Sequence, residues 1–93
     1  MNEVKMYASA WCGYCARARA LLERKGIRFD EIRVDGNREA RREMETLSGR
    51  RSVPQIFIGD RHVGGSAELQ ALEQSGELDA LLAQVPGTGS PLV

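Results

Sequence analysis

Apolar and polar residues alternate in several short stretches of the chain, and this period of two is typical of strands. The stretches 3–8 and 28–34 alternate in this way. The stretch 53–58 is mostly apolar with a proline near its start, a position that a sheet tolerates. Gly59–Asp60 then predicts a tight turn into a short return strand over 61–63. The pattern therefore predicts four strands.

The segments between and after these strands favour helices, because they lack breakers and are bounded by capping residues. Asn37 and Ser66 are the expected N-caps of two helices, and Gly26 is the expected stop of another. Ser75–Gly76 separates the last two. The predicted helices run over 13–25, over 38–47, between Ser66 and Ser75, and over 77–84.

The predicted order of elements is β-α-β-α-β-β-α-α, which defines an α/β fold. The first βαβ unit implies a right-handed crossover to a parallel neighbour, and the last two strands form an antiparallel hairpin. We therefore expect a four-stranded mixed sheet flanked by helices on both faces. One domain is expected over 1–84. The segment 85–93 contains two prolines and two glycines and is expected to be a loose C-terminal tail.

Charge argues against a nucleic-acid partner, because the 93 residues carry 13 basic and 13 acidic side chains. All the Lys and Arg residues precede His62, so the half with the cysteines is cationic, which suits anionic thiol ligands. No signal peptide and no apolar run near the ~20 residues of a membrane span is found. The expected location is the cytoplasm, which keeps thiols reduced.

The two cysteines, Cys12 and Cys15, stand where the helix 13–25 begins. Residues at i and i+3 share one helix face, and so small a disulfide ring adds little stability, so its use is to open and close. Unpaired N–H groups and the helix dipole stabilise a thiolate at Cys12. Cys15, one turn inside, is predicted to be less exposed and less acidic. Cys12 is therefore the predicted nucleophile and Cys15 the resolving thiol.

Two other interpretations of the pair were weighed. A tetrahedral zinc site takes four ligands, whereas the chain has two Cys and one His, so no metal is expected in a monomer. A static disulfide is the second alternative. The C-x-x-C spacing beside a βαβ pattern favours a redox site over both.

With these residues in place, the chain resembles the glutaredoxins, in particular the small dithiol bacterial type with a thioredoxin-like fold. The resemblance extends from about Val4 to Leu82. Four segments carry it: Cys12-Gly13-Tyr14-Cys15, Val34-Asp35-Gly36-Asn37, Ser52 to Ile58 with its Val-Pro, and His62-Val63-Gly64-Gly65-Ser66.

The resemblance implies a glutathione groove beside the nucleophile. In it, Pro54 would be a cis proline facing the cysteines, and the Val53 backbone would pair with glutathione as one strand rung. Gly65 would allow a close backbone approach, and Ser66 would meet the γ-glutamyl carboxylate. Arg41 or Arg42 would pair with the glycyl carboxylate. The implied glutathione-binding residues are Tyr14, Arg41, Ser52, Val53, Pro54, Gly65 and Ser66.

Each of these residues also has a purely structural interpretation. Pro54 could start an edge strand, Gly64–Gly65 could form a turn, and Ser66 could only cap a helix. Tyr14 could be a surface aromatic, and the α-helical arginines could belong to a solvated face. His62 is interpreted as a surface strand residue.

The chain departs from the family pattern at four positions. Gly13 replaces a common proline, and Ser9 replaces a common lysine near the thiolate. Cation support for Cys12 is then expected from the helix end, Arg17 or Arg51. Trp11 before the first cysteine is a thioredoxin-like feature. Ala67 stands where an acidic residue is common, which puts a contact to the glutathione amino group in doubt.

Three functions follow from these features. The leading hypothesis is a glutathione-dependent thiol–disulfide oxidoreductase that reduces protein disulfides and glutathione mixed disulfides, acting as a monomer. The alternative is a [2Fe–2S] carrier dimer, in which Cys12 of each subunit and two glutathiones hold the cluster, an option that Gly13 favours. The third is a thioredoxin-like reductant charged by a flavoprotein reductase, against which Gly64–Gly65–Ser66 argues.

Overall fold

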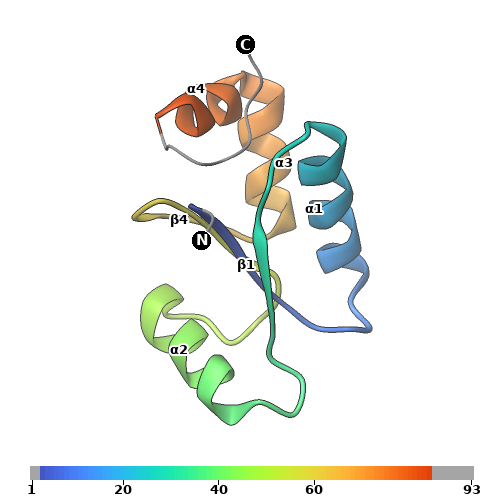
Figure 1. The fold of residues 1–93 in the computed structure, drawn as a ribbon, viewed down its shortest axis with the longest axis vertical. Coiled ribbons are helices and arrows are strands. Elements are labelled where there is room, and N and C mark those ends of the chain that lie inside the picture. The colour runs from blue at the N-terminus through green and yellow to red at the C-terminus, as the bar shows by residue number, and fades with distance from the viewer. Residues whose placement is uncertain (1–2, 85–93) are drawn as a thin grey trace.

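The computed structural model describes residues 3–84, which form one four-stranded sheet and four helices in the predicted order (Figure 1). The segment 85–93, predicted to be a tail, lies outside the described residues. The elements are β1 (Val4–Ala8), α1 (Gly13–Arg24), β2 (Asp30–Arg33), α2 (Arg38–Ser48), β3 (Gln55–Ile58), β4 (Arg61–Gly64), α3 (Ser66–Ser75) and α4 (Glu77–Ala83).

The sheet has the strand order β2-β1-β3-β4. The strands β1 and β2 are parallel, with Tyr7 opposite Ile32, as the first βαβ unit predicted. The strand β3 pairs antiparallel with both β1 and β4. The predicted α/β class with a mixed sheet is confirmed.

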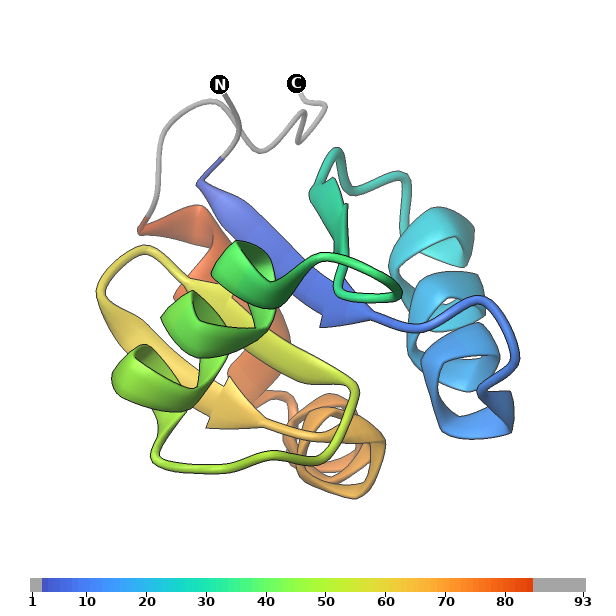
Figure 2. The same ribbon diagram turned by 90° about the horizontal axis from the view of Figure 1, so that it is seen from below.

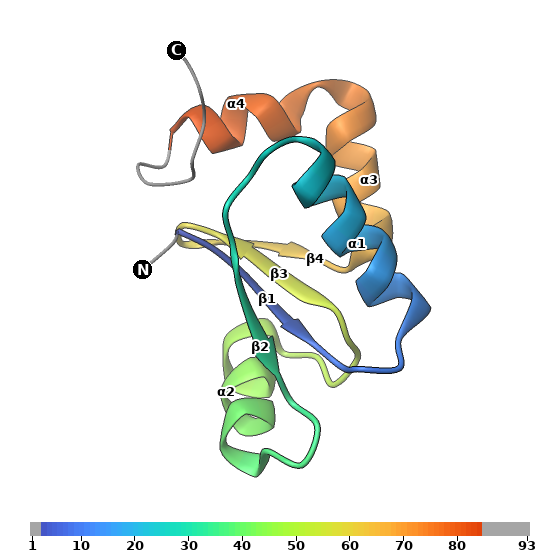
Figure 3. The same cartoon turned by 45° about the vertical axis from the view of Figure 1, so that its right-hand side comes forward.

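Helices cover both faces of this sheet (Figure 3). The helices α1, α3 and α4 lie on one face and α2 lies on the other. Successive side chains of a strand point to opposite faces, so β1 serves two cores: Met6 packs into the larger cluster and Tyr7 into the cluster under α2. Fully buried Leu21, Leu69 and Leu78 bring the three helices of the first face into the larger cluster.

Several predicted boundaries differ from the structure by one or two residues, and two of these differences have a clear physical reason. The third strand begins at Gln55 instead of Val53, because Pro54 has no N–H to give to a strand ladder. The N-cap of α3 is Gly65, and Ser66 is the first helical residue. The carboxylate of Glu68 accepts a 2.7 Å hydrogen bond from the Gly65 N–H, so the cap uses a side chain from inside the helix.

The fold directs the cysteine segment to one end of the sheet. Viewed from below, β1 runs from near the end of α4 to the loop that enters α1 (Figure 2).

Asn37 caps α2 as predicted, since its Oδ1 accepts from the Ala40 N–H at 3.0 Å. Among residues 3–84, none of the helices has the length and apolar character needed to span a membrane.

Candidate active site

Cys12 is the residue at which α1 begins. Its backbone is extended, and its Sγ accepts a 3.2 Å hydrogen bond from the backbone N–H of Cys15. This contact satisfies one of the N–H groups that a helix leaves unpaired at its start. The sulfur is thereby held at the positive end of α1, where negative charge is favoured.

A second contact reaches the Cys12 sulfur from a distant segment. The Cys12 thiol faces the Val53 carbonyl oxygen at 3.7 Å, across 41 positions of sequence. Val53 precedes Pro54, and the peptide bond between them is cis, as the resemblance implied. The structure thus brings Cys12 and the Val53–Pro54 segment together.

Cys15 lies directly inside Cys12 and has no exposed surface. Both thiols are free. Burial, followed by the hydrogen bond with Cys12, raises the pKa of Cys15 to about 11, although the Ser9 backbone and the Arg19 charge act in the opposite direction. Cys15 is therefore a protonated thiol at neutral pH, and Cys12 is the accessible sulfur of the pair.

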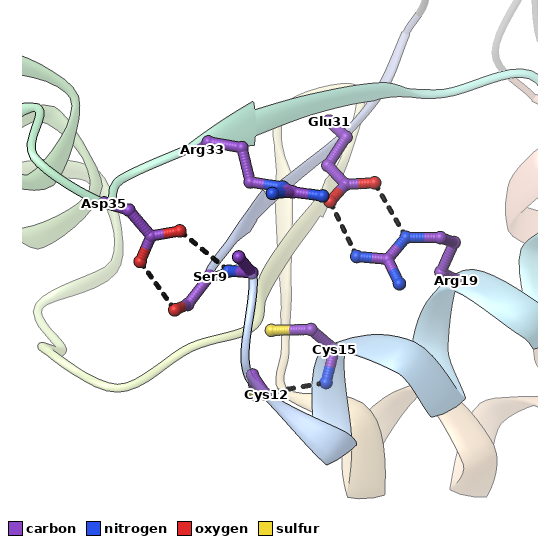
Figure 4. A network of polar contacts seen from close by, with 8 residues as sticks. Ser9, Cys12, Cys15, Arg19, Glu31, Arg33 and Asp35 are labelled. Carbon is purple, nitrogen blue, oxygen red and sulfur yellow. Dashed lines mark hydrogen bonds and ion pairs between the residues drawn. The ribbon is translucent and has the colours of Figure 1, made fainter.

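The loop before Cys12 is anchored by Asp35, which follows β2. One carboxylate oxygen accepts a 2.6 Å hydrogen bond from Ser9 Oγ, and the other accepts a 2.7 Å bond from the Ala10 N–H (Figure 4). These bonds lower the pKa of Asp35. Ser9, which stands where the family commonly has lysine, therefore binds the exposed carboxylate of Asp35.

An ion-pair network fixes α1 against the edge strand β2. Arg19 forms a two-pronged contact with Glu31, from Nε to Oε1 at 2.8 Å and from Nη2 to Oε2 at 2.7 Å, and Arg33 adds a third bond (Figure 4). Arg19, and next Arg33, hold the pKa of Glu31 down at about 2. Arg19 also follows Cys15 by one helical turn, which is the sequence signal that could have identified it.

The loop that carries Val53 is held from both sides of the sheet. From α2, Arg41 Nη1 donates to the Arg51 carbonyl oxygen at 3.5 Å. From α3, Glu68 pairs with Arg50 at 3.4 Å. Of the two candidate arginines on α2, Arg41 is thus the one whose guanidinium reaches the loop beside the predicted groove.

A buried amide supports the same loop and was missed from the sequence. Gln55, with 1% of its surface exposed, donates from Nε2 to the Ser52 carbonyl oxygen at 2.9 Å and to Ser52 Oγ at 3.2 Å. Its Oε1 lies 2.7 Å from His62 Nε2. His62 is therefore a partly buried support of Gln55, and its interpretation as a surface residue was incomplete. A polar residue inside an apolar strand was the available signal.

The glycines before α3 permit a close approach of three segments. Gly64 has φ +116°, and a Cβ there would lie 3.0 Å from the Glu68 carboxyl carbon. A Cβ at Gly65 would lie 3.3 Å from Glu68 Oε1 and 3.5 Å from the Pro54 carbonyl oxygen. Gly65 and Pro54 are therefore neighbours, as a common groove requires, while Ser66 is buried.

The aromatic residues nearest the nucleophile face the solvent. Tyr14 is 64% exposed, and the guanidinium of Arg17 lies over its ring at 5.9 Å from the centroid. Trp11 is 96% exposed. Among residues 3–84, no group of three or more His, Cys, Asp or Glu side chains is arranged to hold a metal ion.

Comparison with known proteins agrees with this geometry. The family model described as glutaredoxin matches residues 4–63. This chain belongs to the glutaredoxin family. The predicted resemblance is confirmed, and with it the activity common to the family, thiol–disulfide exchange as an oxidoreductase.

Two curated bacterial relatives are matched over nearly their whole length. Glutaredoxin of Pseudomonas aeruginosa is 53% identical over 83 residues, covering 89% of this chain and 99% of the relative. Glutaredoxin 3 of Escherichia coli K12 is 50% identical over 82 residues, covering 88% and 99%.

Solved structures show the same fold. The solution structure of glutaredoxin from Brucella melitensis is 50% identical with a TM-score of 0.76, covering 99% of this chain and 96% of that one. The crystal structure of a buckwheat glutaredoxin–glutathione complex is 28% identical with a TM-score of 0.81, covering 89% and 78%. The predicted thioredoxin-like fold is thereby confirmed.

Proposed function

We propose that this glutaredoxin uses glutathione as its reductant, that Cys12 is the nucleophile and that Cys15 resolves protein mixed disulfides. The observation that carries the proposal is the asymmetry of the pair. Cys12 caps α1 and is partly exposed, whereas Cys15 is fully buried with a raised pKa. Only one of the two sulfurs is presented to a substrate, and that sulfur accepts a backbone N–H at the first turn of α1.

The first reaction removes glutathione from a protein. The Cys12 thiolate attacks the glutathione sulfur, a bond forms between those two sulfurs, and the protein sulfur leaves as a thiolate that takes up a proton. A second glutathione thiolate then attacks the glutathione bound to Cys12. Glutathione disulfide leaves, and the Cys12 thiolate is regenerated.

The second reaction reduces a protein disulfide. Cys12 attacks one sulfur, and the other sulfur leaves as a thiolate. Cys15 then loses its proton and attacks the Cys12 sulfur, which releases the reduced protein and leaves a Cys12–Cys15 disulfide. Two glutathione molecules reduce that disulfide and leave as glutathione disulfide. The buried position of Cys15, next to Cys12, suits this intramolecular step.

We place glutathione in the groove formed by the segments that meet beside Cys12. Val53 would offer its backbone to the cysteinyl unit, and Gly65 and Ser66 would lie near the γ-glutamyl carboxylate. Arg41, already at the Arg51 carbonyl, would pair with the glycyl carboxylate. Ser52, Pro54 and Tyr14 would complete the groove. The buckwheat complex supports this assignment through the shared fold.

The experiment compares Cys12→Ser with Cys15→Ser in assays coupled to glutathione reductase. We expect Cys12→Ser to lose both reactions, and Cys15→Ser to keep removal of glutathione from proteins while losing efficient reduction of protein disulfides. Substantial turnover by Cys12→Ser would overturn the assignment of the nucleophile. Reduction by a flavoprotein reductase, without any gain in rate from glutathione, would overturn the assignment of the reductant.

The [2Fe–2S] carrier stays an alternative prediction. One chain would offer Cys12 as its ligand, so the remaining thiolates would come from a second chain and glutathione. Anaerobic reconstitution with glutathione tests it, and a colourless monomer would exclude it. For either function, we propose that residues 1–84 form the glutaredoxin domain and that residues 85–93 form a tail.

A further inference from the structure

Two large aromatic residues flank the nucleophile and face the solvent. Among the described residues, the large hydrophobic side chains that are exposed are Trp11 at 96%, Tyr14 at 64% and Leu47 at 56%. Single exposed apolar residues are ordinary on protein surfaces. Here, however, two of the three lie within two positions of Cys12, where the chain enters α1.

Packing within the chain does not account for Trp11. It belongs to neither hydrophobic cluster of the described residues, and its side chain lies almost wholly in water. An indole offers more apolar contact area than any other side chain, together with one N–H donor. Its removal is therefore expected to leave the fold intact, while its presence provides a rigid surface for another molecule.

The geometry of disulfide exchange indicates which molecule would contact Trp11. In a mixed disulfide the two bonded cysteines have Cα atoms about 4.4–6.8 Å apart. The residues next to the substrate cysteine must then face the residues next to Cys12. The Cys12 sulfur is approached by Val53 on one side, and Trp11 leads into it along the chain. Trp11 therefore lies close to the position that the polypeptide around a substrate cysteine would occupy.

The charge of this surface indicates which residues around the substrate cysteine it would favour. The guanidinium of Arg17 lies over the Tyr14 ring, which makes a mixed aromatic and cationic surface beside Cys12. Trp11 and Tyr14 present apolar faces, and Arg17 favours carboxylates nearby. An extended polypeptide with apolar and acidic residues around its cysteine complements both properties.

We propose that Trp11, Tyr14 and Arg17 form a docking surface for the polypeptide that flanks a substrate cysteine, so that Trp11 raises the efficiency of protein disulfide reduction relative to that of small disulfides. The inference rests on the proposed function, because it assumes that Cys12 is the nucleophile. Trp11 is its central residue. Glutathione would lie in the groove of Val53 and Gly65, and Tyr14 would border both that groove and the docking surface.

The first test measures a ratio of specificities for Trp11→Ala. The probes are insulin, as a protein disulfide, and the mixed disulfide of glutathione with 2-mercaptoethanol, as a small one. We expect the ratio of kcat/KM for insulin to kcat/KM for the small disulfide to fall about tenfold, the scale of a moderate interface hot spot. Trp11→Phe should recover most of the ratio, because it restores an aromatic face.

Leu47→Ala is the matched control. Leu47 is also an exposed apolar side chain, but it lines a hollow of about 340 Å³ with Tyr7 and Phe57 on the α2 face of the sheet. Its substitution should leave the ratio at the wild-type value. A Trp11→Ala ratio within about twofold of wild type would overturn the docking surface, since a lost hot spot costs more than that.

The second test uses Trp11 as the reporter, since it is the single tryptophan of the chain. In Cys15→Ser, Cys12 is trapped in a disulfide with a peptide whose one cysteine is flanked by leucine and glutamate. We expect the indole emission to shift to shorter wavelengths as the peptide covers Trp11, and to shift less with glutathione. Equal spectra for both adducts would contradict the proposal. If Cys12→Ser were active, the proposed function would fail instead, so the two failures are distinguishable.

Discussion

The hydroxyl of Ser9 donates a hydrogen bond of 2.6 Å to Asp35, a residue 26 positions further along the chain. The same carboxylate accepts from the Ala10 N–H at 2.7 Å, so the loop that leads into Cys12 is tied to the turn after β2. A hydrogen bond from the Ser9 backbone in turn acts to lower the pKa of Cys15, against the larger effect of burial. An exposed carboxylate thereby holds the loop that leads to both cysteines.

Asp35→Ala is expected to slow the step in which Cys15 attacks the Cys12 mixed disulfide, by up to about tenfold. The reason is that Asp35 no longer holds the loop that leads into Cys12, so the two sulfurs are less well oriented. Asp35→Asn should recover part of the rate, since an amide still accepts from the Ala10 N–H. Rapid-mixing kinetics of protein disulfide reduction measures this step. An equal loss of rate in the Cys15→Ser background, where that step does not occur, would contradict the role.

Glu31→Gln should destabilise the fold in a pH-dependent manner. Its partners, first Arg19, lower the pKa of Glu31 from 4.5 to about 2, so the ionised carboxylate stabilises the folded state above pH 4.5. That contribution is lost as the pH falls towards 2. We expect a cost of about 1–2 kcal/mol at pH 7, since the pair is partly exposed.

Urea unfolding of wild type and Glu31→Gln between pH 7 and pH 2.5 measures this difference. Asp60→Asn, which changes an exposed carboxylate in the turn after β3, is the control and should show little change. A difference for Glu31→Gln that stays constant over the whole range would contradict the ion-pair explanation.

Alkylation should separate the two thiols. Cys15 is fully buried, and burial first of all raises its pKa to about 11, so at pH 7 it is a protonated thiol without access to reagent. We expect iodoacetamide to modify Cys12 first in the wild type, and to modify Cys12→Ser only slowly until urea unfolds it. Mass spectrometry of timed samples measures the reaction, and rapid modification of folded Cys12→Ser would contradict the burial of Cys15.

Gln55→Ala should affect both stability and binding. It removes the donor to Ser52 and the partner of His62 from a buried site, at a cost of about 1–3 kcal/mol. Because Ser52 lies in the loop that carries Val53, the KM for glutathione should also rise. Unfolding curves and glutathione titrations measure the two effects. A loss of stability with an unchanged KM would separate Gln55 from the groove.

The order of elements and the site segments could be predicted because each depends on local signals. Alternation identified the first two strands, an apolar run and a turn identified the other two, and Asn37 and Gly26 marked helix ends. The cap of α3 was assigned one residue too late, because Gly65 supplies only backbone and the capping carboxylate comes from Glu68. A serine beside a glycine is the more obvious cap by residue type.

The polar contacts around the site could not be predicted from one sequence. The pairs Ser9–Asp35 and Arg19–Glu31 join segments that meet only after the βαβ unit has folded. Many acidic and basic side chains were equally plausible partners before that. The buried Gln55 was detectable as a polar residue in an apolar strand, but its contact with His62 depends on the register between β3 and β4.

Because Cys12 is also the cap of α1, the choice of its replacement decides what an inactive variant reports. Serine is among the preferred residues at this position, so Cys12→Ser exchanges the reactive atom while the helix keeps its first side-chain bond. Alanine would remove both. The serine variant is therefore expected to fold and to bind ligands without reacting with them. It is suited to measuring the affinity for glutathione by calorimetry, and the affinity for disulfide substrates that the wild type would reduce.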